Sequence, residues 1–140
     1  MTMPPAMSND EAQAAWAALV REVRTGVLLT LRNGRPFGSH VPYVFGDDWT
    51  RAYLHLSRLA LHTQHLLQDV RVSLFVSEPD GPGKNPQALK RCNLQGEAAV
   101  LRPDAPDYAR MKERYLARFP QSAMMFGFGD FDLWELRMHD

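Results

Sequence analysis

The sequence predicts a mainly β protein: an antiparallel barrel of six strands, in Greek-key or meander order, with about three flanking helices. Short apolar segments recur between turn residues along most of the chain, and several connections are too short for the crossover helices of a parallel sheet. Two longer segments carry apolar residues at helical spacing. The length of 140 residues is typical of one domain with one hydrophobic core.

The N-terminal region predicts a leader followed by a helix. Residues 1–7 contain two prolines and no periodicity, which is typical of a disordered leader, so we expect a single domain over residues 8–140. Ser8 and Glu11 have the spacing of a capping box. The alanine-rich segment up to Arg24 has apolar residues on one face, which indicates an amphipathic helix.

Six segments have the composition of strands. Asn33-Gly34 between the first two is a strong hairpin-turn signal. Pro42 in the second segment cannot donate to a strand ladder, so it marks an edge, a bulge or a place where another element abuts. Gly96 indicates a bulge or a close backbone approach. The expected strands cover residues 27–31, 36–45, 51–56, 70–76, 89–101 and 128–138.

Two further helices are expected between these strands. Ser57 has the residue type of an N-cap for a short helix over residues 59–68. Pro103-Asp104 is typical of a helix start, and the apolar spacing that follows predicts a helix to Phe119. Residues 78–86 contain three prolines and two glycines, which predicts an exposed loop.

Charge and composition exclude several classes of protein. Lys and Arg number 16, as do Asp and Glu, so the net charge is zero and gives no field that attracts nucleic acid or anionic lipid. No apolar run approaches the roughly 18–20 residues of a membrane helix, and the N-terminus lacks the features of a secretory signal. The single cysteine, Cys92, cannot form an internal disulfide, which favours the reducing cytoplasm. We expect a cytoplasmic protein with neither nucleic acid nor membrane as a partner.

The common metal and nucleophile patterns are incomplete. His62 and His65 are three residues apart on an expected helix, but no cysteine or carboxylate pattern completes a metal shell, so we expect no metal site. Cys92 lies in an expected strand, which is typical of an inert core cysteine.

The turn after the third expected strand is the best candidate for a binding site. Ser57 and Thr63 flank the expected helix start, and His62 lies beside them. A helix N-terminus with hydroxyl and imidazole groups is suited to a phosphate, because free amides and the helix dipole both favour an anion. An ordinary helix cap remains the alternative for Ser57, and a solvated helix face remains the alternative for His62.

Four sequence blocks in this order resemble one family. They read Gly-Ser-His-Val-Pro-Tyr at 38–43, Tyr-Leu-His-Leu-Ser-Arg-Leu-Ala-Leu-His-Thr at 53–63, Asp-Val-Arg-Val-Ser-Leu at 69–74 and Arg-Cys-Asn-Leu-Gln-Gly at 91–96. Their order and spacing are similar to those of the pyridoxamine 5′-phosphate oxidase-like, FMN-binding split-barrel proteins, particularly the branch associated with haem utilisation. Residues 114–116 and 129–131 also resemble that branch, so the likeness runs from about Thr25 to Arg137.

The resemblance implies a homodimeric FMN-dependent oxidoreductase with a split barrel, two FMN sites in the dimer interface and a small-molecule substrate. Arg91 would supply a cation for the phosphate or for the polar edge of the flavin ring, and Trp134 would approach the ring from the partner subunit. The other positions implied are Ser39, Pro42 and Tyr43 along the ring or ribityl chain, Leu56 and Ser57 beside the flavin, and His62 and Thr63 at the phosphate. The resemblance identifies no catalytic acid or base.

Two departures from the family pattern limit what is expected. Residues 39–44 are neutral apart from His40, and the C-terminal region offers only Arg137 and His139, so we do not expect oxidation of pyridoxamine phosphate. The sequence stops at Asp140, without the C-terminal extension that carries the haem-binding histidine in haem-degrading members. The alternatives are a haem-binding or haem-degradation-related protein and a non-catalytic flavin-binding module.

Overall fold

The computed structural model describes residues 9–47 and 49–139. The expected leader and the Ser8 cap lie outside these residues, as does Asp48, which the sequence predicts in a turn with Gly46 and Asp47. Among the described residues, the helices are α1 (Asn9–Glu22), α2 (Leu61–Gln68), α3 (Tyr108–Arg118) and α4 (Ala123–Phe126), with 3-10 turns η1 (Pro86–Ala88) and η2 (Pro120–Ser122). The strands are β1 (Thr25–Arg32), β2 (Arg35–Pro42), β3 (Val44–Phe45), β4 (Arg51–Ser57), β5 (Arg71–Ser77), β6 (Arg91–Leu101) and β7 (Phe131–Met138).

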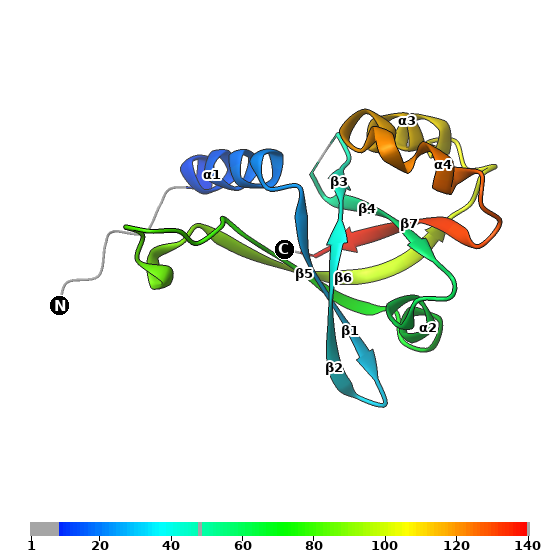
Figure 1. Cartoon of the computed structure of the whole chain (residues 1–140), viewed down its shortest axis with the longest axis horizontal. Helices are drawn as coiled ribbons and strands as arrows, with labels where there is room; N and C mark the ends of the chain where they lie inside the picture. The colour runs from blue at the N-terminus through cyan, green and yellow to red at the C-terminus, as the bar shows by residue number, and fades with distance from the viewer. Residues whose placement is uncertain (1–8, 48, 140) are drawn as a thin grey trace.

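The strands form one curled antiparallel sheet in the order β2-β1-β5-β6-β7-β4-β3 (Figure 1). In Figure 1, α3 and α4 lie together beside β3 and β4, while α2 lies near the β1–β2 hairpin. Asn33 and Gly34 both have positive φ, as the predicted hairpin turn requires. The predicted class, a mainly β split barrel, is confirmed. None of the helices in the described residues is long and apolar enough to cross a membrane.

The sheet has seven strands in the described chain because the expected second strand divides at Tyr43. Its first part, β2, pairs with β1, where Pro42 lies opposite Thr25. Its second part, β3, pairs with β4, where Val44 lies opposite Tyr53. Pro42 therefore marks the point at which the chain changes its pairing partner. A proline suits this point because it has no N–H to donate to a ladder.

The two later helices begin further along the chain than expected. Helix α2 begins at Leu61 and not at residue 59. Helix α3 begins at Tyr108, because Pro103 and Pro106 disfavour helical backbone at the residues that precede them. The short helix α4 was not expected from the sequence.

Strands β4 and β7 contribute to two apolar clusters because successive strand residues point to opposite faces. The cluster inside the curl includes Leu54 and Leu136, which are fully buried. The cluster on the other face joins Leu133 to Met111 and Tyr115 of α3. A Cβ at Gly96 would overlap the main chain at Arg137, so this glycine permits the close approach of β6 to β7.

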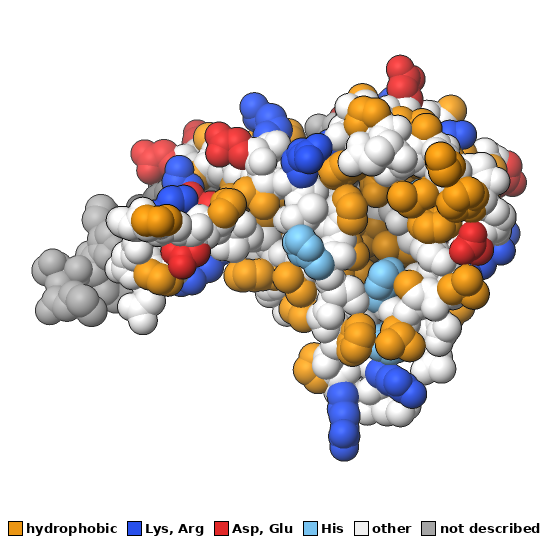
Figure 2. Space-filling view, in the orientation of Figure 1, with side chains coloured by type: hydrophobic (Ala, Val, Ile, Leu, Met, Phe, Trp, Pro, Cys, Tyr) orange, Lys and Arg blue, Asp and Glu red, His pale blue; other side chains and the backbone are white. Residues whose placement is uncertain are grey.

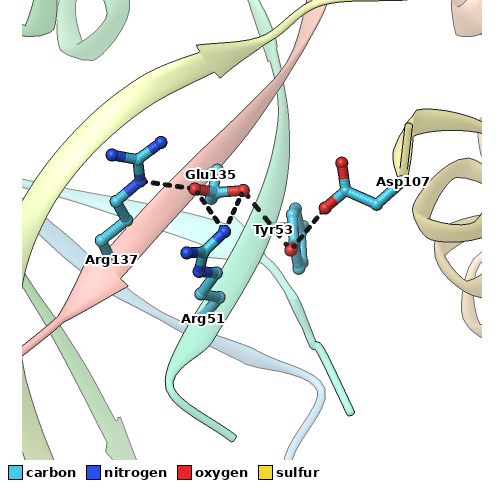
Figure 3. Close-up of polar contacts among 5 residues, drawn as sticks. All are labelled: Arg51, Tyr53, Asp107, Glu135 and Arg137. Atoms are coloured by element: carbon cyan, nitrogen blue, oxygen red, sulfur yellow. Dashed lines mark hydrogen bonds and ion pairs between the residues drawn. The ribbon is translucent and has the colours of Figure 1, made fainter. Parts of the chain in front are cut away.

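A buried carboxylate also ties the sheet to the start of α3 (Figure 3). Glu135 of β7 is 3% exposed and pairs with Arg51 at 3.3 Å and with Arg137 at 2.7 Å. The Tyr53 hydroxyl lies 3.5 Å from Glu135 and 3.4 Å from Asp107, which precedes α3. Burial and the nearby carboxylates raise the pKa of Tyr53 to about 12, so its hydroxyl remains a donor.

Candidate functional site

Helix α2 begins without a side-chain cap. Ala60 occupies the N-cap position and makes no side-chain hydrogen bond there. Ser57, the expected cap, accepts a hydrogen bond from the Leu59 amide at 3.2 Å and donates to Asp130 at 3.0 Å. Since no acidic residue lies in the first turn either, the amides of that turn remain available to an external anion.

Two side chains in the first turn of α2 have polar atoms without a partner in the described chain. Thr63 is 1% exposed, and its Oγ1 is one of these atoms; the other is Nε2 of His62. A buried hydroxyl without a partner is costly, and a bound acceptor would remove that cost. Burial, with a smaller contribution from His65, lowers the pKa of His62, so its imidazole is neutral at pH 7.

His65 holds α2 against the sheet. It is buried, and its Nδ1 lies 3.0 Å from Oγ1 of Thr30 on β1. Its ring packs edge-on against Phe37 of β2 at 4.9 Å. Ser39 lies two residues along β2 from Phe37 and points to the same side of the strand, which places it on the face that α2 covers. Figure 2 shows histidine side chains among hydrophobic ones on the face that carries β2 and α2.

Arg58 is a candidate site residue that the sequence interpretation missed. It lies between Ser57 and α2, and its guanidinium binds both carboxylate oxygens of Asp132, at 2.8 and 3.0 Å. The pKa of Asp132 is lowered mainly by this hydrogen bonding. The sequence feature that could have identified Arg58 is its position directly before the expected helix start at residue 59. That helix has no acidic residue in its first turn.

Three predicted site residues have buried side chains. Tyr43 is fully buried and donates its hydroxyl to the Val23 carbonyl at the end of α1; burial raises its pKa to about 12. Leu56 and Trp134 belong to the cluster inside the curl. Nε1 of Trp134 has no partner among residues 9–47 and 49–139. Pro42, by contrast, is exposed at the end of β2.

Arg91 is separated from the other predicted phosphate residues within one chain. It lies opposite Ser77 at the end of β5, whereas α2 leads into the start of β5 at Arg71. Seven strand residues span about 20 Å at roughly 3.3 Å per residue. Its exposed guanidinium donates to the Gln87 carbonyl at 3.1 Å. The chain thus brings Ser57, His62 and Thr63 together in one turn but leaves Arg91 at the far end of the sheet.

The arrangement around α2 suits a phosphate group. It combines open main-chain amides, a buried hydroxyl without a partner, a neutral imidazole and one nearby guanidinium. Such groups bind a dianion through several hydrogen bonds and one charge pair. Within the described chain, no three His, Cys, Asp or Glu side chains are arranged to hold a metal ion.

Comparisons with known proteins agree with the fold. The family model described as pyridoxamine 5′-phosphate oxidase matches residues 12–140. No curated protein sequence matches the chain significantly. A haem-binding protein from Mycobacterium smegmatis aligns with a TM-score of 0.80 and 25% identity, over 99% of this chain and 53% of that one. This chain therefore spans about half the length of the mycobacterial protein.

Two further solved structures share the fold at lower identity. HutZ, described as the haem storage protein of Vibrio cholerae, aligns with a TM-score of 0.78 and 23% identity, over 91% of this chain and 90% of that one. A FAD-binding protein from Mesorhizobium loti aligns with a TM-score of 0.73 and 16% identity, over 91% of this chain and 88% of that one.

Proposed function

The chain belongs to the pyridoxamine 5′-phosphate oxidase family, and we propose that it binds FMN and acts as a flavin-dependent oxidoreductase. The observation that carries this proposal is the uncapped start of α2 with the unpartnered hydroxyl of Thr63. A phosphate ester supplies the acceptor oxygens that these donors lack. When bound, FMN supplies hydride or one-electron chemistry, and the protein positions it.

The residues present fit the phosphate of FMN. The first-turn amides of α2, Oγ1 of Thr63 and the ring N–H of His62 would donate to its oxygens. Arg58 would supply the cation once its guanidinium turns from Asp132 to the phosphate. An Arg fork matches the geometry of a phosphate as well as that of a carboxylate.

The flavin ring and ribityl chain would lie along β2 and the end of β4. Of the predicted contacts on β2, Ser39 faces this side, whereas Pro42 lies three residues further on and points to the opposite face of the strand. Tyr43, Leu56 and Trp134 would support that surface from beneath, since their side chains are buried. Residues 39–44 include no lysine or arginine, so we do not propose pyridoxamine phosphate as the substrate.

We further propose that a second copy of the chain completes the site. Val27 of β1 and Phe75 of β5 are paired and half-buried on the face of the sheet that points away from the inner cluster. A hollow of about 420 Å³ lies over neighbouring residues of β1, β5 and β6. Arg91 points to this same face, because it pairs with Ser77 two residues beyond Phe75. A partner packed there would receive Arg91 from this chain.

Flavin titration tests the cofactor. We expect protein purified with added FMN to retain the yellow chromophore and to quench FMN fluorescence at micromolar protein. Loss of all flavin on gel filtration, together with unchanged fluorescence, would contradict the proposal. The ligand's phosphate can be tested separately with riboflavin, which shares the ring and should bind at least tenfold more weakly.

Mixed dimers test whether Arg91 acts across the interface. Arg58→Gln and Arg91→Ala should each weaken FMN binding about ten- to hundredfold, the range for hydrogen bonds to charged groups. If each site takes Arg58 from one subunit and Arg91 from the other, a dimer of one Arg58→Gln and one Arg91→Ala subunit has one site with both changes and one site with neither. Random mixing should therefore restore the original affinity at about a quarter of the sites. Restoration at no site would mean that both arginines act from one subunit, whereas an unchanged affinity of Arg91→Ala alone would mean that Arg91 does not act.

Haem binding is the second candidate. It is favoured by the alignment with the mycobacterial haem-binding protein over 99% of this chain. Hemin titration distinguishes the two: a shifted Soret band that one histidine-to-alanine change abolishes supports haem, whereas an unchanged spectrum supports flavin. His40 on the exposed part of β2 and His62 are the histidines to change first.

A further inference from the structure

A second hollow, of about 370 Å³, lies between the end of α1, strand β3 and helix α3. Its volume is within the range of small-molecule sites. Strand β3 pairs with the start of β4, whereas α2 follows the end of β4, so the two regions are roughly 15–20 Å apart. The side chains that define the hollow are Arg21, Phe45, Asp47, Trp49, Arg114 and Arg118.

One wall of this hollow is aromatic and firmly held. The rings of Phe45 and Trp49 lie 6.0 Å apart and are inclined by 37°. Trp16 packs edge-on against both from behind, at 5.0 and 5.3 Å. Trp49 has a φ of +63°, which costs a residue other than glycine about 1–2 kcal/mol. The chain thus accepts backbone strain at the residue that presents its indole here.

The remaining walls are strongly basic. Among the described residues that line the hollow, three carry a guanidinium group and one, Asp47, carries a carboxylate. Arg114 and Arg110 both pair with Asp47, so its charge is already engaged. Arg21 lies over the Trp49 ring at 5.8 Å, and no acidic residue in the described chain pairs with it. Figure 2 shows basic side chains between α1 and α3.

Arg118 is the half-buried cation of this hollow. Its Nη2 donates to the carbonyls of Val20 and Val23 at 2.8 and 3.0 Å, which caps the end of α1. Its Nε is buried and has no partner among the described residues, and no carboxylate there pairs with the guanidinium. The guanidinium also lies over the rings of Tyr43 and Phe119, at 5.1 and 5.8 Å. A half-buried cation without a paired carboxylate is stabilised by a bound negative charge.

We propose that this hollow binds a planar aromatic carboxylate, with the ring of the ligand against Trp49 and Phe45 and its carboxylate toward Arg118 and Arg21. The flat wall favours a ring over an aliphatic chain. The guanidinium groups favour a carboxylate, which they can bind through two parallel hydrogen bonds. This site is independent of FMN binding at α2.

Calorimetric titration with 2-naphthoate and its neutral analogue 2-naphthylmethanol tests the proposal. We expect the acid to bind at least tenfold more tightly than the alcohol. Arg21→Gln should weaken binding of the acid about three- to tenfold and leave the alcohol unchanged, while Trp49→Leu should weaken both. The matched control Arg32→Gln, at the tip of the β1–β2 hairpin, should change neither affinity.

Several results would overturn the proposal. They are the absence of binding at millimolar naphthoate, equal affinities for the acid and the alcohol, and an unchanged affinity in Arg21→Gln. Displacement of naphthoate by FMN would place it at α2 and would also overturn the proposal. If Trp49→Leu does not fold, the naphthoate affinity of Arg21→Gln still tests the proposal. This substitution alters an exposed side chain that makes no hydrogen bond in the described chain, so we expect the variant to fold.

Discussion

The guanidinium of Arg58 binds both oxygens of the Asp132 carboxylate, which joins the end of β4 to β7 directly beside the start of α2. The Arg58 amide also donates to the carbonyl of Asp130 at 2.6 Å, and Ser57 donates to the carboxylate of the same residue. Two carboxylates therefore surround the region where we propose that a phosphate binds. Arg58 is the only lysine or arginine among the described residues 57–63, and Asp132 binds it in the same two-oxygen geometry that a phosphate would use.

Asp132→Asn should strengthen FMN binding. The change removes a charge that competes for Arg58 and that repels the phosphate, so we expect the dissociation constant to fall about three- to tenfold. Arg58→Gln should raise it about ten- to hundredfold. Fluorescence titration measures both. Arg21→Gln, an exposed residue at the end of α1 beside the second hollow, is the matched control and should have no effect. Weaker binding by Asp132→Asn would mean that Asp132 positions Arg58 for the phosphate.

Thr63→Val should separate binding from folding. The substitution preserves the side-chain shape but removes Oγ1, which is buried and unpartnered in the described chain. We expect the free energy of unfolding of the ligand-free protein to stay within about 0.5 kcal/mol or to rise, because an unsatisfied group disappears. FMN binding should weaken about three- to tenfold. Urea unfolding and flavin titration measure the two effects. A large loss of stability with unchanged binding would show that Thr63 serves only the packing of α2.

Most of the strands were predictable because they are short apolar segments between strong turn signals, whereas the mostly exposed β2 was indicated by the hairpin turn at Asn33-Gly34. Their partners were less accessible to local sequence: the change at Tyr43 from pairing with β1 to pairing with β4 depends on contacts made after the chain has curled. Arg58 was missed for a similar reason, since its partner Asp132 is 74 residues away. Arg91 was assigned to the phosphate by resemblance, but linear spacing does not show which end of β6 lies near α2.

Glu135→Gln should destabilise the protein. The Glu135 carboxylate is almost fully buried and holds Arg51, Arg137 and Tyr53, so the variant loses two charge-assisted contacts. Its arginine partners remain partly solvated, which limits the loss to about 2 kcal/mol. Urea unfolding measures it. Asp69→Asn, in the exposed pair with Arg71, is the matched control and should lose less. Equal losses in both variants would show that burial adds nothing to the Glu135 network.

Acid should destabilise the fold through His55. This side chain is 9% exposed and stacks on Phe126 at 3.7 Å; burial lowers its pKa to about 4, and Lys112 adds to this while Asp132 opposes it. Above pH 6.5 the imidazole is neutral in both the folded and the unfolded chain. Between about pH 6.5 and 4 the unfolded chain takes up a proton that the folded chain does not, so the free energy of unfolding falls as the pH falls.

The loss attributable to His55 should reach at most about 3 kcal/mol near pH 4, from 1.36 kcal/mol per pKa unit. Urea unfolding at several pH values between 7 and 4.5 measures the slope. His55→Gln should flatten that slope even if it lowers stability at pH 7, because the variant has no proton to take up at this position. His40→Gln, which changes an exposed histidine on β2, should keep the original slope. An unchanged slope in His55→Gln would mean that other groups, with His62 first among them, carry the acid sensitivity.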